Sequence, residues 1–146
     1  MKIKRIDGRY LKSLYKLGKE QFEGEFWFTK NFLRKAIERE GLYFGAFDKN
    51  KLIGAIFVDI LDRPKAWLFF FDVKKSYRKH GIGNKLISSV EKKLPKEFDK
   101  LFVDFEKIDK SAVKFYKEHG FKRQAKIKDW FGKGTYGLIY SKTVKR

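Results

Sequence analysis

The chain has 146 residues, of which 42% are hydrophobic and 37% charged, so it is expected to form one folded domain over residues 1–146 rather than a disordered chain. No apolar run reaches the roughly 20 residues of a membrane span, and the first residues lack a signal-peptide pattern, which predicts a cytoplasmic protein without membrane contact. The absence of cysteine excludes disulfides, thiolate metal sites and an acyl-cysteine intermediate.

The formal net charge of +18 leaves two interpretations open. An acidic partner such as nucleic acid, a ribosome, an acidic protein or a phosphorylated cofactor would match this charge. Alternatively, the lysines form an ordinary solvated surface, which their spread along the whole chain favours.

The first half of the chain shows two helical patterns and a run of strands. Thr29 is a candidate N-cap, and Gly41 is expected at the C′ position of the same helix. The aromatic stretch Phe22–Phe28 either fills the core or lines a substrate pocket. The elements predicted in chain order are a strand at Lys2–Ile6, helices at Arg9–Lys19 and between Thr29 and Gly41, and strands at Leu42–Phe47, Leu52–Leu61 and Trp67–Val73.

The second half begins with a glycine-bearing turn and a helix whose apolar stripe ends before Pro95. A strand at Leu101–Phe105 should lie parallel to Trp67–Val73, because a helix connects the two. A short helix capped by Ser111 and ended by Gly120 follows. The chain then closes with a hairpin of strands at Phe121–Asp129 and Tyr136–Thr143.

The turn at Arg78–Gly83 is a candidate anion site. Free backbone N–H groups at a helix start attract anions, and glycines allow a phosphate to approach the backbone closely. The phosphate-loop signature is absent, and Gly81-Ile82-Gly83 lacks the third glycine of the dinucleotide signature. The turn alone therefore fits either a pyrophosphate site or an ordinary strand-to-helix connection.

Two motifs together resemble the GNAT superfamily of N-acetyltransferases. The first is a strand that ends in valine, then a turn with the pattern Arg/Gln-x-x-Gly-x-Gly/Ala and a helix, which corresponds to Val73–Gly83. The second, Asn-x-x-Ala followed by an aromatic-Tyr pair and Gly-Phe, corresponds to Asp109–Phe121. The chain departs from the family pattern at Lys75, where proline is common, at Lys79, where glycine is common, and at Asp109, which replaces asparagine.

The resemblance implies a GNAT fold of the α/β class, with a mostly antiparallel sheet of six to seven strands, one splayed parallel pair and about four helices. It also implies acetyl-CoA as co-substrate. The turn would bind the pyrophosphate, the end of the preceding strand would pair with the pantetheine arm, and the second motif would contact that arm as well. The cofactor-binding residues implied in this way are Phe71, Asp72, Val73, Arg78, Lys79, His80, Gly81, Ile82, Gly83, Asp109 and Tyr116.

The resemblance further implies direct attack by an amine on the thioester. A lysine-type amine has a pKa of about 10.4 and needs a base, directly or through water. Family members that act on protein N-termini carry an acidic residue five positions before the motif asparagine, which corresponds to Asp104, and Glu106 shares its strand face. Tyr116 corresponds to the residue that protonates the departing thiolate. His80 and His119 are expected at the surface, and no metal site is predicted.

The acceptor is therefore expected to be a protein N-terminus, a lysine or a small amine, and the charge argues against polyamines. One alternative is a basic nucleic-acid-binding module that uses lysines with Phe26, Trp27, Trp130 and Phe131. Another is a CoA sensor without turnover. Ribosome or nucleic-acid contact and a monomeric or homodimeric state both stay open.

Overall fold

The computed structural model describes all 146 residues. Seven strands form one sheet in the order β1-β2-β3-β4-β5-β7-β6, and only the β4–β5 pair is parallel. This confirms the predicted mixed sheet with its single parallel pair and four α-helices. The elements are β1 (Lys2–Arg5), α1 (Leu11–Phe22), α2 (Lys30–Glu38), β2 (Gly41–Asp48), β3 (Lys51–Asp59), β4 (Ala66–Val73), α3 (Ile82–Lys93), β5 (Lys100–Glu106), α4 (Lys110–Glu118), β6 (Lys122–Lys128) and β7 (Tyr136–Thr143).

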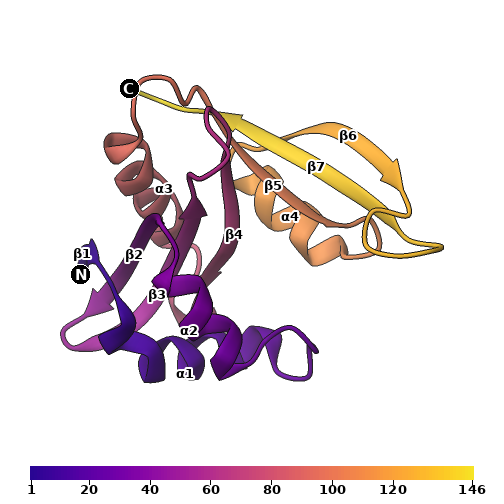
Figure 1. Cartoon of the computed structure of the whole chain (residues 1–146). Coiled ribbons are helices and arrows are strands. Elements are labelled where there is room, and N and C mark those ends of the chain that lie inside the picture. Colours follow the sequence, from indigo (N-terminus) through magenta and orange to yellow (C-terminus); the bar gives the residue numbers. More distant parts are fainter.

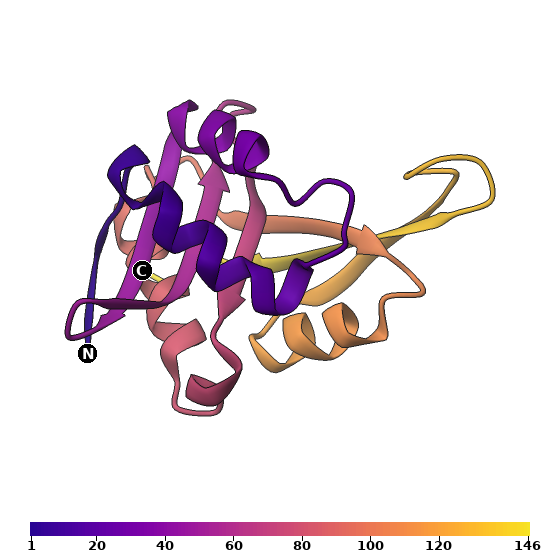
Figure 2. The same cartoon turned by 90° about the horizontal axis from the view of Figure 1, so that it is seen from below.

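The helices lie on both faces of the sheet (Figures 1 and 2). Helices α1 and α2 pack on one face of the first half, around a core of 13 buried residues that includes Leu14, Leu33 and Phe57. Helices α3 and α4 lie on the opposite face, where a core of 24 buried residues includes Leu86 and Leu101. The apolar stripe predicted for the helix after the glycine turn is therefore confirmed as core.

Two predicted helix ends are wrong. Helix α2 ends at Glu38, and Gly41 is the first residue of β2, where an added Cβ would lie 2.5 Å from the carbonyl oxygen of Val58. The glycine is needed for close approach of two strands, not for a helix C′ turn. Helix α4 is capped by Asp109, whose Oδ1 accepts the N–H of Ala112 at 3.0 Å, and not by Ser111.

Thr29 caps α2 as expected, since its hydroxyl oxygen accepts the N–H of Phe32 at 3.0 Å. The aromatic stretch before it mostly fills the core: Phe28 is buried and stacks on Tyr15. Phe26 is the exception, with 92% of its surface exposed. The stretch therefore both packs against α1 and presents one large apolar side chain to solvent.

The sheet opens between β4 and β5. The two strands are paired only at Ala66 with Leu101 and at Trp67 with Phe102. Beyond this point they diverge, as Figure 1 shows, so the last half of β4 has no partner on its β5 side. Because the N–H of Lys74 donates to the carbonyl oxygen of Ile53 on the β3 side, alternation directs the backbone groups of Phe71 and Val73 toward the gap.

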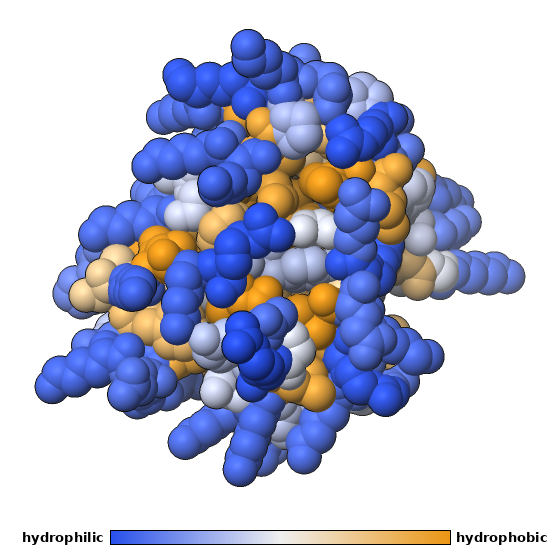
Figure 3. Space-filling model, turned by 60° about the vertical axis from the view of Figure 1, so that its left-hand side comes forward, coloured by the Kyte–Doolittle hydropathy of each residue, from blue (hydrophilic) through white to orange (hydrophobic).

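Hydrophilic side chains surround scattered apolar patches on the face shown in Figure 3. They do not gather in one cluster there, which fits the interpretation of the lysines as a dispersed solvated surface. No helix is long and apolar enough to cross a membrane.

Candidate active site

The turn between β4 and α3 is built to accept an anion. No hydrogen bond within the chain engages the backbone N–H groups of residues 79–84, and the first helical bond of α3 runs from Lys85 to Gly81. Lys79 and Gly81 both have left-handed backbones, with φ of 66° and 78°. Such turns point successive N–H groups into one concavity, which favours a phosphate group. The left-handed φ of Lys79 also explains why glycine is common at this position of the motif.

The side chain of Arg78 turns away from this concavity. Its Nε donates to the carbonyl oxygen of Val73 at 2.8 Å, and its guanidinium also donates to Gln21 of α1 at 2.8 Å. Its own N–H donates to the carbonyl oxygen of Lys75 at 3.3 Å. The side chain of Arg78 therefore stabilises the turn through β4 and α1. The free backbone N–H groups extend one residue beyond the predicted range, to Asn84.

Helix α1 is tied to the same turn. Glu20 accepts the N–H of Lys75 at 2.6 Å, and its carboxylate lies 3.6 Å from the ammonium of Lys74. Both contacts lower the pKa of Glu20, the backbone hydrogen bond most strongly. Nothing in the sequence pattern distinguishes Glu20 from the neighbouring polar residues of α1, so this contact was not predicted.

His119 is half-buried and lies against the helix start, whereas His80 is exposed. Its Nδ1 donates to the carbonyl oxygen of Phe115 at 2.7 Å, and its ring packs on Phe115 and Phe71. A Cβ on Gly83 would lie 2.3 Å from Nε2 of His119. The second glycine of the turn is therefore required for close packing of α3 against the end of α4.

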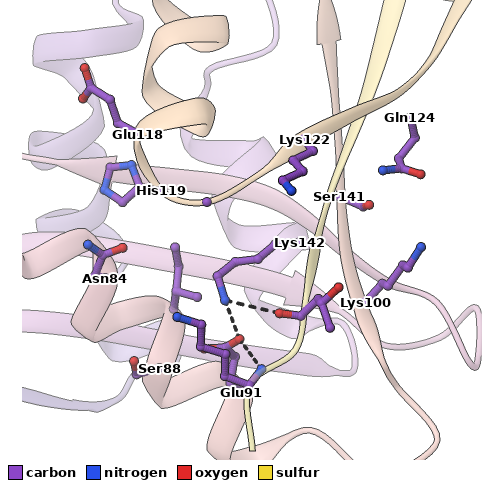
Figure 4. A pocket seen from close by; sticks show the side chains of 14 residues that line it. Asn84, Ser88, Glu91, Lys100, Glu118, His119, Lys122, Gln124, Ser141 and Lys142 are labelled. Atoms are coloured by element: carbon purple, nitrogen blue, oxygen red, sulfur yellow. Dashed lines mark hydrogen bonds and ion pairs between the residues drawn. The ribbon is translucent and has the colours of Figure 1, made fainter.

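A polar groove of about 700 Å³ continues from this point between α3, the end of α4 and the last strands (Figure 4). Asn84 and His119 stand at one end of it. Toward the other end, the buried carboxylate of Glu91 accepts hydrogen bonds from the ammonium of Lys142 and from the backbone N–H of Lys145, both at 2.7 Å. The groove has the volume of a small-molecule site and adjoins the anion-binding turn.

Tyr116 lies where the sheet opens. Its ring stacks on Phe105 of β5 at 5.4 Å and contacts Phe71 of β4 at 6.3 Å, so it spans the two diverging strands. The hydroxyl has no hydrogen-bond partner within the chain, and no buried polar side-chain atom lacks a partner, so this hydroxyl reaches solvent. Burial raises the pKa of Tyr116 well above its ordinary value, and the charges of Asp109 and Asp104 add to the effect.

Asp104 and Glu106 lie on the other face of β5. Their half-buried side chains alternate with buried Val103 and Phe105, which face α4. Asp104 accepts the indole N–H of Trp130 at 2.9 Å. Trp130 itself packs over Gly137, where an added Cβ would lie 2.5 Å from the indole. The hairpin between β6 and β7 is thus folded onto the strand that carries both predicted carboxylates.

A third carboxylate at the opening was predicted only for its backbone. Asp72 is 3% exposed, and burial raises its pKa from 3.8 to about 7, against the opposing charge of Arg78. Its Oδ1 lies 3.5 Å from the guanidinium of Arg78. A near-neutral pKa of a buried carboxylate is typical of functional sites.

The remaining predicted residues lie around the turn and the gap. Phe71 and Val73 present their backbones to the gap, and His80, Ile82 and Gly83 follow within the turn. Asp109 lies at the start of α4 with its Oδ1 engaged in the cap. No three metal-ligating side chains come together anywhere in the chain.

Comparison with known proteins identifies the family of the chain. The chain matches the model of the Acetyltransferase (GNAT) family over residues 11–121. It therefore belongs to the GNAT family of acetyltransferases and is an acyltransferase, which confirms the resemblance of its two motifs. No sequence among curated proteins matches the chain significantly.

Solved structures share the fold at low identity. An aminoglycoside 6'-N-acetyltransferase complexed with coenzyme A is 18% identical, with a TM-score of 0.81 over 100% of this chain and 98% of that one. The ribosomal-protein-S18-alanine N-acetyltransferase of Escherichia coli is 19% identical, with a TM-score of 0.74 over 99% and 94%. The PaiA N-acetyltransferase of Thermoplasma acidophilum, in complex with coenzyme A, is 24% identical, with a TM-score of 0.75 over 97% and 98%.

Proposed function

We propose that the protein transfers an acetyl group from acetyl-CoA to a primary amine by direct attack in a ternary complex. The observation that carries the proposal is the open sheet beside the anion-binding turn, with Tyr116 on one face and Asp104 on the other. Asp104 can then accept a proton from the amine on one face of the gap, and Tyr116 can donate a hydrogen bond to the leaving sulfur on the other. The family and the CoA complexes of two structural neighbours support acetyl-CoA as the donor.

In this proposal the free N–H groups of residues 79–84 hold the pyrophosphate of the co-substrate, and Lys79 and His80 lie beside it. The edge of β4 at Phe71–Val73, which has no strand partner and where Arg78 engages only the carbonyl of Val73, takes up the pantetheine arm as an added strand. The groove that begins at Asn84 and His119 offers space for the adenosine end. Asp109 contributes through the start of α4, because its carboxylate fixes that end of the helix.

The base is a carboxylate at the gap. The amine must lose a proton, directly or through water, before or during attack on the carbonyl carbon. Asp104 is the first candidate and Glu106 the second, since both face the side of the sheet opposite Tyr116. The buried Asp72 is a third candidate, because its raised pKa suits proton acceptance near neutral pH.

Tyr116 acts on the sulfur. Because its pKa is raised, the hydroxyl stays protonated at neutral pH and can donate a hydrogen bond to the sulfur as the C–S bond breaks. The thiolate finally takes a proton, and the amine has given one up, so the reaction is balanced without any other reactant. The half-buried ring between Phe71 and Phe105 holds the hydroxyl at this position.

The chain serves as one acetyltransferase domain in this proposal. The family match ends at residue 121, but β6 and β7 complete the same sheet beyond it. The two named neighbours that act on an aminoglycoside and on an alanine of a ribosomal protein have very different acceptors, so the fold does not define the acceptor.

A thiol-release screen with acetyl-CoA over peptides, amino acids and amines tests the proposal. We expect CoA release that depends on one acceptor class, together with thermal stabilisation by acetyl-CoA. Ligand at about a hundred times its dissociation constant should add roughly 2.7 kcal/mol to the free energy of unfolding. Stabilisation without turnover on any amine would favour a CoA sensor, and absence of both effects would refute acetyl transfer.

A further inference from the structure

The sheet face that carries Asp104 also carries a strip of apolar side chains. Trp67 of β4 and Phe102 of β5 are directly paired, and their rings lie 5.3 Å apart at an angle of 31°. Phe102 and Asp104 share this face because they are two positions apart on one strand. Ile139 of β7 lies opposite Asp104, and Ala125 of β6 lies opposite Ile139. We refer to Trp67, Phe102, Ile139 and Ala125 as the apolar strip.

The apolar strip belongs to neither core of the molecule. All four side chains are half-buried, and neither hydrophobic core includes them. The core under α1 and α2, on this side of the sheet, contains no residue of β5, β6 or β7. In Figure 2 the tip of the β6–β7 hairpin curls away from α4, toward the side on which α1 and α2 lie. The strip is therefore an apolar surface without a partner inside the chain, which is typical of a binding site.

The strip begins where the sheet opens. Trp67 and Phe102 form the last pair between β4 and β5 before the strands part. Asp104, the first candidate for the base, follows Phe102 by two positions along the edge of the gap. Residues two positions apart on a strand are separated by about 7 Å. A group that packs on Phe102 is therefore only a few bonds away from a group that reaches Asp104.

Trp130 lies beside the carboxylate end of the strip. Its indole N–H donates to Asp104 at 2.9 Å, and its ring packs over Gly137, which lies opposite Glu106. An indole beside a carboxylate offers a cation both an ionic contact and an aromatic face. The site thus places an apolar floor at one end and groups that attract an amine at the other.

This combination restricts the chemistry of the acceptor. A carboxylate attracts the ammonium form of an amine, and the apolar floor stabilises an apolar group attached to it. A polyhydroxylated acceptor would lose hydrogen bonds to water over this floor without gaining others. A second copy of the chain on the same face would bury Asp104 and Glu106, two carboxylates that form no ion pair within the chain, and burial of unpaired charge is costly.

We propose that the acceptor is an amine joined by two or three carbon atoms to an aromatic ring. This inference rests on the proposed acetyl transfer and narrows its acceptor. The ring packs on Trp67 and Phe102, and the amine lies at Asp104 beside the gap. The unit of ring, two carbons and nitrogen occurs in a free arylethylamine and also at the N-terminus of a peptide that begins with an aromatic residue.

A series of amines tests the proposal on the unaltered protein. Thiol release from acetyl-CoA gives kcat/KM for ethylamine, benzylamine, 2-phenylethylamine and an aminoglycoside. We expect 2-phenylethylamine to exceed ethylamine at least about tenfold, because its ring is removed from water, and to exceed benzylamine, whose ring is one carbon nearer to the nitrogen. Equal values for ethylamine and 2-phenylethylamine, or the highest value for the aminoglycoside, would overturn the inference.

Two peptides that differ only in their first residue distinguish the sources of the ring. The peptide that begins with Phe should exceed the peptide that begins with Ser. If the Phe peptide also exceeds 2-phenylethylamine, the acceptor is a polypeptide N-terminus, and the reverse order assigns a free arylalkylamine. Equal values for the two peptides, together with equal values for the two amines, would exclude a site for the ring.

The variant Phe102→Ala tests the position of the site. It should lower the ratio of kcat/KM for 2-phenylethylamine to kcat/KM for ethylamine about fivefold, because the ring loses part of its floor. The matched control Tyr136→Ala removes an aromatic ring from the opposite face of β7, beside Lys126, and should keep the ratio. A ratio that survives in Phe102→Ala, or falls equally in the control, would contradict this site. The amine series needs no variant, so the inference is testable even if Phe102→Ala does not fold.

The outcomes separate this inference from the proposed function. Acetylation of amines without preference for a ring would overturn the aromatic acceptor and leave acetyl transfer intact. A dimer in analytical ultracentrifugation that Phe102→Ala dissociates, without any preference for a ring, would assign the strip to a second copy of the chain instead. Failure to acetylate any amine would overturn both proposals.

Discussion

The two halves of the sheet are built differently. Strands β2 and β3 are buried along nearly their whole length, because α1 and α2 cover one face and α3 the other. In β5 buried residues alternate with half-buried ones, and most residues of β6 are exposed, because α4 covers only one face of these strands. The predicted chemistry lies along the open half and at the line where the halves part.

This difference separates stability from function. The covered half supplies continuous apolar contact, so its residues set the free energy of unfolding. The open half keeps Asp104, Glu106 and Trp130 accessible on a sheet face that no helix covers, at the cost of buried area. Substitutions should therefore affect unfolding in the covered half and turnover in the open half.

The largest expected effect is on stability, for Phe57→Ala in β3. Phe57 is fully buried, and its ring meets those of Tyr43 at 5.0 Å and Phe70 at 4.9 Å. Removing it leaves a cavity between the sheet and α1–α2, so we expect a loss of about 3–5 kcal/mol in the free energy of unfolding. Urea unfolding measures this, and Phe131→Ala in the exposed hairpin should change it by less than about 0.5 kcal/mol.

The second prediction concerns the boundary between the halves. Asp72 keeps its proton to about pH 7 when folded but loses it near pH 4 when unfolded. The folded state therefore binds the proton more tightly, and the free energy of unfolding falls as the pH rises between these values. The two pKa values correspond to a total fall on the order of 4 kcal/mol, which is an upper limit for a group beside Arg78.

The neutral variant Asp72→Asn should lack this fall. Urea unfolding at pH 5 and pH 8 should show that the original protein loses clearly more stability across this interval than the variant does. Equal losses in both proteins would mean that Arg78 compensates the buried charge fully. In that case Asp72 acts as a brace for the turn, and its candidacy as the base is withdrawn.

The third prediction moves to the gap itself. Tyr116→Phe should lower kcat about 10- to 100-fold, because the leaving sulfur loses its hydrogen-bond donor. The hydroxyl has no partner within the chain, so the free energy of unfolding should change by less than about 1 kcal/mol. Steady-state kinetics and CoA titration measure the two effects. An unchanged kcat would remove Tyr116 from the proposed chemistry without affecting the family.

Much of this arrangement is readable in the sequence, for identifiable reasons. The strand Trp67–Val73 is apolar nearly throughout because it lies in the middle of the sheet, and the period of Ile82, Leu86 and Val90 follows from their contact with β2 and β3. The turn and Tyr116 belong to motifs whose spacing is characteristic. Such signals are local, so one stretch of residues suffices to detect them.

Other features depend on contacts between distant segments. The buried charge of Asp72, the hold of Glu20 on the turn, and the packing of His119 over Gly83 each join residues from different elements. Nothing in the residues next to Gly41 shows that Val58 approaches it. The hydrogen bond from Trp130 to Asp104 spans 26 positions, so the sequence gives Asp104 as a candidate but not its partner.

That hydrogen bond provides the smallest and sharpest test of the open half. Trp130 is 44% exposed, so Trp130→Phe should cost less than about 1 kcal/mol in the free energy of unfolding. The indole N–H holds the carboxylate of Asp104 in place, and its loss leaves that side chain free to move. If Asp104 is the base, Trp130→Phe should therefore lower kcat/KM about two- to tenfold, because the base is less well positioned. The control Phe131→Leu, which removes no hydrogen bond, should leave kcat/KM unchanged. An unchanged kcat/KM in both variants would move the base assignment to Glu106 or Asp72, since neither accepts a hydrogen bond from this indole.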